Sequence, residues 1–295
     1  MENLYDVIVI GSGPAGITAG IYGRRAGLST LIIEGNYIQG GQILNTYEVD
    51  NYPGLQGVGG FELASKLRSH ADAMGAEIIT AEVKEVALSG DVKRVVTEDA
   101  VYEGKTVILA TGATHRKLGV PGEEELLGAG VSYCATCDGA FFRGKEDALF
   151  LSRISSKVYL IHRRDEFRGV KSLQEKVFAA ENIEIIWNTV AEEVVGDGKV
   201  EALALQNRVT GETYSLSVQG VFVAVGIQPN TELFRGMMEL DKSGYICAGE
   251  EGNTSIPGVF AAGDVRTKQL RQVITAAADG ANAVTSVEHY LNSLS

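Results

Sequence analysis

Tyr5-Asp6-Val7-Ile8-Val9-Ile10, followed at once by Gly11-Ser12-Gly13-Pro14-Ala15-Gly16, is the stretch that decides the fold of this chain. The apolar run predicts a buried parallel strand, and Ile17 to Arg25 continues as a predicted helix. The next apolar run, Ser29 to Glu34, is a second predicted strand, and it ends in an acid. This order of strand, glycine turn, helix and strand is typical of a dinucleotide-binding fold.

Each part of this unit has a chemical reason. The glycines permit a tight turn, a close approach of a pyrophosphate and close packing of the helix, whose N-terminus offers N–H groups to the phosphates. Glu34 lies 23 residues after Gly11, and its carboxylate can bond a ribose hydroxyl but would repel a 2′-phosphate. The complete context favours this interpretation over a purely structural glycine turn.

A second candidate element lies near the C-terminus. Val259 to Ala262 is an apolar run closed by Gly263 and Asp264, and Gln272 to Leu291 is a predicted long helix with an alanine-rich face. Asp264 could hold a cofactor hydroxyl, with the helix start near the cofactor head. The alternative is a turn aspartate that caps a helix.

The stretch Cys134-Ala135-Thr136-Cys137-Asp138 indicates redox chemistry, because it holds two of the three cysteines of the chain. A Cys-x-x-Cys pair can close into a small, reducible disulfide, and its thiolates often have lowered pKa values. Asp138 could move a proton to or from a departing thiolate. Zinc is disfavoured, because only Cys247 remains as a further thiol and the four histidines are dispersed.

A second nucleotide site is indicated where Lys157 to Ile161 resembles the earlier Thr30 to Glu34 strand but ends in His162, Arg163 and Arg164. Arginines at such a strand end favour a 2′-phosphate and hence NADPH over NADH, and Arg168 would add a further cation. The alternative is a solvated run that pairs partly with its own acids, Asp165 and Glu166.

The second site lacks its first half. Counting back 23 residues from His162 reaches Gly139, where no Gly-x-Gly-x-x-Gly stands, and Asp147 to Leu151 has the pattern of a helix tail. We favour a segment lost from the sequence between Glu146 and Asp147, because deleting the middle strand of a parallel sheet should disrupt the domain. The other interpretation is a true deletion that impairs NADPH binding.

Length and charge limit the remaining possibilities. The 295 residues predict two domains, and the net charge of −12 disfavours nucleic acid or an anionic membrane as a partner. Three cysteines cannot form a disulfide framework, which favours a reducing compartment. Because the first residues have no basic stretch and only a short apolar run, we expect no signal or membrane segment and a cytoplasmic protein.

Further patterns predict the remaining organisation. We expect an amphipathic helix over 61–74, a meander of short strands over 77–97 and a buried strand over 106–112. We also expect a solvated acidic run at 123–125, a strand that closes the second domain over 221–226 and a turn at 227–230. The chain crosses twice between domains, which predicts a double hinge and domain rotation.

The ordered set of motifs resembles the low-molecular-weight, prokaryotic-type thioredoxin reductases from end to end. The residues that carry the resemblance are Gly11 to Gly16, Gly40-Gly41-Gln42, Ala110-Thr111-Gly112, Cys134 to Gly139, His162-Arg163-Arg164 with Arg168, Gly226 to Asn230, Ala262-Gly263-Asp264 and Arg271-Gln272-Val273.

The resemblance implies an α/β fold of two Rossmann-like three-layer domains, in which an NADPH domain is inserted into a discontinuous FAD domain. We expect the FAD domain at 1–114 and 236–295, and the NADPH and redox-disulfide domain at 115–235. It also implies a homodimer and thioredoxin as partner. The implied FAD residues are Gly11, Ser12, Gly13, Pro14, Ala15, Gly16, Glu34, Gly41, Gln42, Asn51, Ala110, Thr111, Gly112, Gly263, Asp264, Arg271, Gln272 and Val273. The implied NADPH residues are His162, Arg163, Arg164 and Arg168.

By position, the resemblance implies that Cys137 lies next to the flavin, that Cys134 attacks thioredoxin and that Asp138 is the acid–base residue. Three rivals remain open. One is a flavin reductase that takes electrons from ferredoxin, which the missing loop favours and the retained arginines disfavour. The second is a flavoprotein that feeds a peroxidase, whose relatives carry further domains ahead of the first strand. The third is a flavin-bound redox sensor without turnover.

Overall fold

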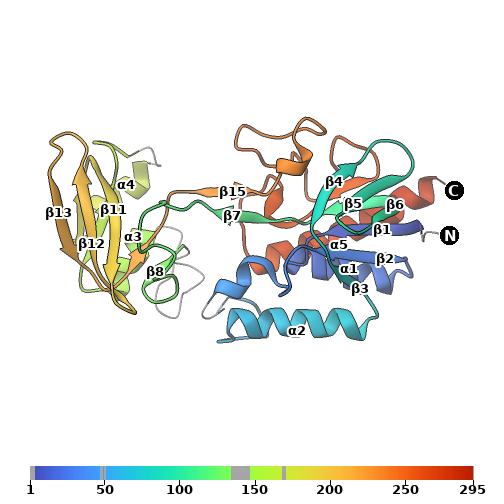
Figure 1. Ribbon diagram of the computed structural model, residues 1–295, viewed down its shortest axis with the longest axis horizontal. Coiled ribbons are helices and arrows are strands. Elements are labelled where there is room, and N and C mark those ends of the chain that lie inside the picture. The colour runs from blue at the N-terminus through green and yellow to red at the C-terminus, as the bar shows by residue number, and fades with distance from the viewer. Residues whose placement is uncertain (1–3, 47–48, 50, 134–146, 168–170, 295) are drawn as a thin grey trace. The chain divides into compact units, whose positions relative to one another are not determined.

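The computed structural model describes residues 4–46, 49, 51–133, 147–167 and 171–294 (Figure 1). The chain divides into two compact units. The first unit comprises residues 1–45, 60–114 and 227–295, and the second comprises residues 46–59 and 115–226. The assignment of one cofactor to each of the two predicted domains remains a prediction. No helix in the described ranges is both long and apolar enough to cross a bilayer.

The first unit is built on a seven-stranded mixed sheet in the order β3-β2-β1-β6-β5-β4, with β16 pairing with β6. The strands β3, β2, β1, β6 and β16 run parallel, whereas β4, β5 and β6 form an antiparallel meander. The bounds are β1 Leu4–Ile10, β2 Thr30–Glu34, β3 Glu77–Thr80, β4 Val83–Ala87, β5 Lys93–Thr97, β6 Val101–Leu109 and β16 Val259–Ala261.

Two sequence expectations change here. The meander expected over 77–97 begins only at Val83, because β3 pairs in parallel with β2 and extends the nucleotide-fold side of the sheet. The strand expected from Thr106 begins earlier, at Val101. Its first half pairs with β5 and its second half with β16, so that β6 joins the meander to the parallel strands.

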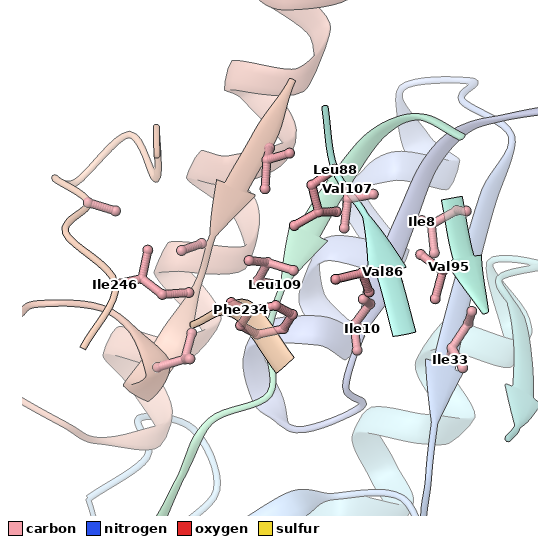
Figure 2. Packing of buried hydrophobic residues seen from close by; sticks show 14 of the residues in the cluster. Ile8, Ile10, Ile33, Val86, Leu88, Val95, Val107, Leu109, Phe234 and Ile246 are labelled. Carbon is pink, nitrogen blue, oxygen red and sulfur yellow. The ribbon is translucent and has the colours of Figure 1, made fainter. Parts of the chain in front are cut away.

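The alternation of side chains along β1 explains the three layers. Val7 and Val9 pack against the helices on one face of the sheet, whereas Ile8 and Ile10 pack into a second cluster on the other face. Figure 2 shows this second cluster, in which Phe234 lies beside the strand residues. Each such side chain contributes about 1.5–3 kcal/mol on burial, so β1 anchors the core on both faces.

The helices of this unit fit the expected pattern. They are α1 Pro14–Arg25, α2 Gly60–Ala73 and α5 Val273–Ser293, with the short turns η1 Gly41–Asn45, η2 Glu232–Phe234 and η3 Gly263–Val265. Small residues let α1 and α5 approach closely, because a Cβ on Gly280 would lie 2.1 Å from the carbonyl oxygen of Ala15. The glycine turn and α5 are therefore locked together.

The described residues of the second unit form three small sheets. One is antiparallel, β11-β12-β13, and two are parallel pairs, β9 with β10 and β8 with β14. The bounds are β8 Val131–Ser132, α3 Asp147–Ile154, β9 Val158–Ile161, α4 Lys171–Ala179, β10 Ile183–Ile186, β11 Thr189–Gly196, β12 Val200–Asn207, β13 Thr213–Ser217 and β14 Val221–Phe222. Its core consists of Leu126, Val131, Val194, Val200, Leu203, Leu205, Val221 and Val223.

Two short strands occupy the segments where the chain passes from one unit to the other. β7 Ala113–His115 pairs with β15 Ile227–Pro229. The prediction of a turn at Ile227–Asn230 is therefore wrong for its first three residues. They pair with β7, a strand that no local sequence pattern predicts as their partner. The strand expected to end at Gly226 is also shorter, because β14 ends at Phe222.

Candidate functional site

The glycine turn has the geometry that close approach requires. Gly11 has a φ of +103°, and a Cβ on it would lie 2.4 Å from the carbonyl oxygen of Ala110. A Cβ on Gly16 would lie 1.8 Å from the carbonyl oxygen of Gly11. The predicted residues Gly11, Gly16 and Ala110 therefore meet at the carboxyl ends of β1 and β6, and larger side chains cannot replace the two glycines without moving backbone.

Glu34 is tied to this turn. The buried carboxylate accepts the backbone N–H of Ser12 at 2.8 Å and its hydroxyl at 2.7 Å on Oε2. Its Oε1 accepts the N–H of Asn36 at 2.9 Å and the Asn36 amide at 3.0 Å. An anion held at the end of β2, next to the glycine turn, suits a ribose hydroxyl and opposes a 2′-phosphate.

The Gly41 loop lies against the same turn. A Cβ on Gly41, whose φ is +62°, would lie 3.3 Å from the Cα of Gly13. The Gln42 amide donates a hydrogen bond to the carbonyl oxygen of Ala113. Asn51 belongs by its contacts to the second unit, where Asn51, Tyr52, Pro53, Gly54 and Gln56 line a hollow of about 570 Å³.

The Ala110–Gly112 segment is held by Asn230. Thr111 Oγ1 donates to the carbonyl oxygen of Asn230 at 2.7 Å, and the Asn230 amide donates back to the Thr111 carbonyl oxygen at 2.8 Å. The backbone N–H of Asn230 also donates to the carbonyl oxygen of Gly112 at 3.0 Å. These bonds join two segments more than a hundred residues apart in the sequence.

Asp264 carries the clearest indication of a ligand-binding position. Its Oδ1 is buried and, within the described residues, has no hydrogen-bond partner. Burial raises the pKa of this carboxyl, and the charges of Lys268, Arg271 and Arg266 oppose that effect without cancelling it. An unpaired buried acceptor costs about 1–3 kcal/mol, so this oxygen is suited to a donor such as a cofactor hydroxyl.

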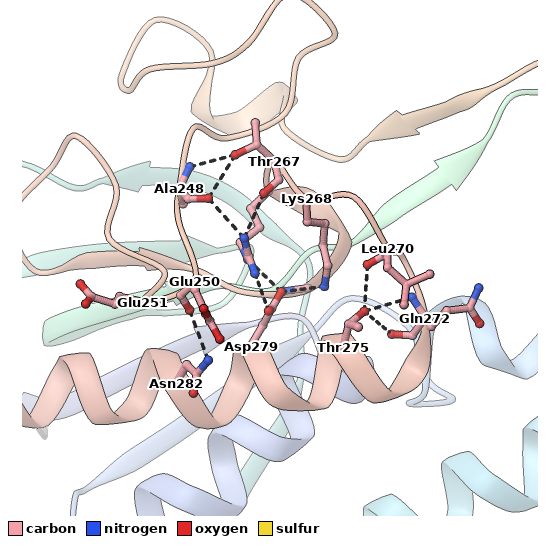
Figure 3. A network of polar contacts seen from close by, with 12 residues as sticks. Ala248, Glu250, Glu251, Thr267, Lys268, Leu270, Gln272, Thr275, Asp279 and Asn282 are labelled. Atoms are coloured by element: carbon pink, nitrogen blue, oxygen red, sulfur yellow. Dashed lines mark hydrogen bonds and ion pairs between the residues drawn. The ribbon is translucent and has the colours of Figure 1, made fainter. Parts of the chain in front are cut away.

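Asp264 does not cap the long helix. The N-cap of α5 is Gln272, whose backbone N–H donates to Thr275 Oγ1 at 3.2 Å (Figure 3). The helix-cap alternative for Asp264 is therefore wrong. Arg271 lies over the ring of Tyr245, 4.1 Å from its centroid, and its buried Nε has no partner in the described part of the chain.

The first unit thus brings most of the predicted FAD residues together. The fit to a dinucleotide rests on two kinds of observation: glycines where any Cβ would strike backbone, and a buried carboxylate oxygen without a donor. The predicted residues in this unit are Gly11 to Gly16, Glu34, Gly41, Gln42, Ala110 to Gly112, Gly263, Asp264 and Arg271 to Val273.

The predicted dithiol site, Cys134, Cys137 and Asp138, lies outside the described residues. Tyr133, directly before Cys134, is described, and its hydroxyl donates to Glu123 Oε1 at 2.9 Å. Burial, with the hydrogen bond and charge of Glu123, raises the pKa of Tyr133 to about 12.

The expectation of a solvated acidic run over 123–125 is wrong for Glu123, whereas Glu124 and Glu125 are exposed. Its side chain is buried, and it also accepts the N–H groups of Leu118 at 2.8 Å and Gly119 at 2.7 Å. Burial raises the pKa of Glu123, but these bonds and the one from Tyr133 outweigh it, so the pKa lies below its usual value. Within the acidic run, Glu123 is therefore a buried carboxylate with a structural role.

At the second nucleotide site, β9 leads directly into His162, as expected. The ring of His162 packs edge-on against Phe167 and Trp187, with centroids 5.1 and 5.5 Å away. Arg163 and Arg164 form no ion pair with other described residues, including Asp165 and Glu166, so the self-pairing alternative gains no support. Arg168 lies outside the described residues.

The strand and glycine loop that the sequence lacks near Glu146 and Asp147 are also not seen in the described sheets of the second unit. β9 pairs with β10, and β8 pairs with β14, but no strand in the described ranges joins the two pairs. Asp147, the first residue described after Tyr133, already lies in a helix. The missing glycine loop itself stays a prediction, because 134–146 lie outside the described residues.

Comparison with known proteins fixes the family. The profile of the pyridine nucleotide-disulphide oxidoreductases matches residues 5–280, and the chain belongs to this family. A thioredoxin reductase from Peptoclostridium acidaminophilum is 45% identical over 310 residues, covering 99% of this chain and 98% of the relative. Those 310 aligned positions exceed the 295 residues of this chain, so the relative carries at least 15 residues without a counterpart here.

Solved structures agree, and the predicted α/β fold is confirmed. The crystal structure of thioredoxin reductase from Streptococcus pyogenes MGAS5005 has 44% identity and a TM-score of 0.89, covering 99% of this chain and 100% of that one. A ferredoxin-flavin thioredoxin reductase from Clostridium acetobutylicum is less similar, with 31% identity and a TM-score of 0.56 over 99% of this chain and 100% of that one.

Proposed function

We propose that the chain is a thioredoxin-disulfide reductase that passes electrons from NADPH through FAD and the Cys134–Cys137 disulfide to oxidised thioredoxin. The proposal that the first unit binds FAD rests on the unpaired, buried Oδ1 of Asp264, in the unit that also holds the glycine turn and Glu34. Full-length similarity to thioredoxin reductases supports the substrate.

The geometry supports the proposed cofactor-binding roles. The N–H groups at the start of α1 are suited to the pyrophosphate of FAD, Glu34 to a ribose hydroxyl and Asp264 to the ribityl chain. FAD, when bound, supplies a two-electron acceptor for the NADPH hydride and a donor for the disulfide. Arg163 and Arg164, which form no ion pairs among the described residues, are suited to the 2′-phosphate of NADPH.

The proposed thiol–disulfide steps balance in bonds, electrons and protons. Two electrons break the Cys134–Cys137 bond, leaving Cys137 next to the flavin and freeing Cys134, and Asp138 exchanges the proton. The Cys134 thiolate attacks the disulfide of thioredoxin, forms a mixed disulfide and expels a thioredoxin thiolate. The Cys137 thiolate then attacks Cys134, which re-forms the enzyme disulfide and releases thioredoxin as a dithiol.

Two finer assignments complete the proposal. A homodimer is proposed from the family resemblance. A cytoplasmic location is proposed from the cysteine usage, since a reducible catalytic pair in a chain of three cysteines suits a reducing compartment.

The experiment is an anaerobic titration of the purified flavoprotein with NADPH, followed by oxidised thioredoxin, with flavin absorbance as the signal. NADPH should bleach the flavin, and thioredoxin should restore its colour. If dithionite but not NADPH bleaches it, the NADPH assignment is wrong, and reduced ferredoxin becomes the donor to test. If NADPH bleaches it but thioredoxin never restores the colour, the redox-sensor alternative gains support.

The roles of the two cysteines are tested by substitution. Cys134→Ser should abolish thioredoxin reduction while NADPH still bleaches the flavin. Cys247→Ser is the matched control, because this third thiol lies apart from the dithiol in the sequence and should leave both activities unchanged. Loss of flavin reduction as well in Cys134→Ser would contradict the assigned roles.

A further inference from the structure

A buried ionic cluster lies behind the Asp264 segment, and none of the assigned roles uses it. Its centre is Asp279 on α5, whose side chain is 6% exposed (Figure 3). Oδ1 of Asp279 accepts Arg266 Nη2 at 2.6 Å. Oδ2 accepts Arg266 Nε, Lys268 Nζ and the backbone N–H of Gly263, each at 2.9 Å.

The two cations depend on Asp279 to different degrees. Arg266 also donates to the carbonyl oxygens of Thr267 at 2.9 Å and Ala248 at 3.3 Å. Lys268 is buried too, with 6% of its side chain exposed, and within the described residues Asp279 is its one ion-pair partner. A buried ammonium group that loses its counter-charge must find another.

Asp264 is an alternative counter-charge for Lys268. Lys268 is the largest of the charges that lower its pKa, followed by Arg271, so the ammonium group acts electrostatically on this carboxyl. Yet Asp264 Oδ1 remains without a partner. Because a buried unpaired carboxylate oxygen attracts any available donor, something must keep Lys268 from it.

Asp279 is also rigidly placed relative to the glycine turn. The next residue, Gly280, packs so closely on α1 that a Cβ would meet the Ala15 carbonyl oxygen. A Cβ on Gly263 would in turn lie 2.9 Å from the Cβ of Ala15. The Asp279 carboxylate therefore ties α5 to the Gly263–Asp264 turn, and Gly280 and Gly263 pack these two elements against Ala15 of α1.

We propose that Asp279 is a positioning residue for the cofactor site. It holds Arg266 and Lys268 away from Asp264 and fixes the Gly263 N–H, so that Asp264 Oδ1 stays available to a hydroxyl of the dinucleotide. This inference rests on the FAD half of the proposed function and is independent of NADPH and thioredoxin.

The test measures the dissociation constant for FAD by fluorescence on reconstituting deflavinated full-length protein, without NADPH or thioredoxin. Asp279→Asn should weaken FAD binding roughly tenfold or more, because an uncompensated Lys268 then pairs with Asp264. Adding Lys268→Met should restore most of the affinity, since the freed cation is gone. Asp72→Asn, which breaks the exposed Arg68–Asp72 pair of α2, is the matched control and should bind like the wild type.

The double variant separates positioning from plain structural support. Removing the uncompensated ammonium group can restore stability under either role. Only a positioning role predicts that the FAD dissociation constant of the folded single variant rises and returns toward the wild-type value in the double variant. Unchanged FAD affinity in Asp279→Asn would overturn the proposal, and so would a double variant as weak as the single one. If Asp279→Asn fails to fold, recovery of both folding and FAD binding in the double variant supports the proposal, and failure there overturns it. If wild-type protein binds FAD but reduces no thioredoxin, only the proposed function fails.

Discussion

Tyr133, the residue before Cys134, donates its hydroxyl hydrogen to the buried carboxylate of Glu123 over 2.9 Å. Glu123 in turn holds the backbone of Leu118 and Gly119. The predicted redox dithiol therefore begins one residue after a side chain that is fixed to the core of the second unit. This relationship gives two predictions.

The first prediction is that Tyr133→Phe destabilises the second unit by about 1.5–3 kcal/mol, because a charged, buried acceptor loses one of its donors. Trp187 is the only tryptophan of the chain and lies in this unit, so its fluorescence during urea unfolding of the deflavinated protein reports the change. Tyr214→Phe is the matched control, because Tyr214 is exposed on β13 and no hydrogen bond of its hydroxyl is seen in the described residues. An equal loss in both variants would contradict the prediction.

The second prediction concerns acid. The pKa of Glu123 is lower in the folded chain than the ordinary glutamate value of 4.5. The folded state therefore binds this proton less readily than the unfolded state, so the stabilisation is complete above the unfolded pKa and is lost as pH falls through the folded pKa. Glu123→Gln should be less stable than the wild type at neutral pH, with a difference that shrinks as pH falls below 4.5. Trp187 fluorescence across pH measures it, and a constant difference would refute it.

The third prediction concerns the glycine turn. Gly16→Ala should abolish FAD binding, because the added methyl group would lie 1.8 Å from the carbonyl oxygen of Gly11 and must displace α1. The measurement is the flavin content of the purified protein from its absorbance ratio. Gly249→Ala is the control, since nothing lies within 4 Å of a Cβ there. Normal flavin content in Gly16→Ala would show that the turn tolerates a side chain.

The fourth prediction concerns the gap in the second unit. Inserting a strand and glycine turn of at least 15 residues, the minimum excess of the Peptoclostridium acidaminophilum relative, between Glu146 and Asp147 should tighten NADPH binding roughly tenfold or more. The reason is that pyrophosphate oxygens would gain charge-assisted hydrogen bonds from the new helix N-terminus.

Isothermal titration of both chains with NADPH makes the comparison, and FAD affinity serves as the internal control because the first unit is untouched. If the 295-residue chain already binds NADPH as tightly as the inserted one, the loop is dispensable and the predicted gap has no functional consequence.

Much of the first unit was predictable because its signals are local. The alternation in β1, the glycines after it and the acid at Glu34 each follow from backbone geometry within a few residues. Two of the strand and turn expectations that were wrong involve partners distant in the sequence: β3 joins β2 rather than the meander, and Ile227–Pro229 pairs with β7.

The sequence by itself determined the dinucleotide-binding class of the first unit and the candidate dithiol, because turns, strands and reactive side chains are set by short-range patterns. Several of the predicted cofactor residues came instead from the family resemblance. Only the tertiary structure decided that Glu123 is buried, that Asn230 holds Thr111 and that Asp279 forms ion pairs with Arg266 and Lys268. A charged residue has the same appearance in a sequence whether it faces water or a buried counter-charge. Its role therefore depends on which distant segment packs against it.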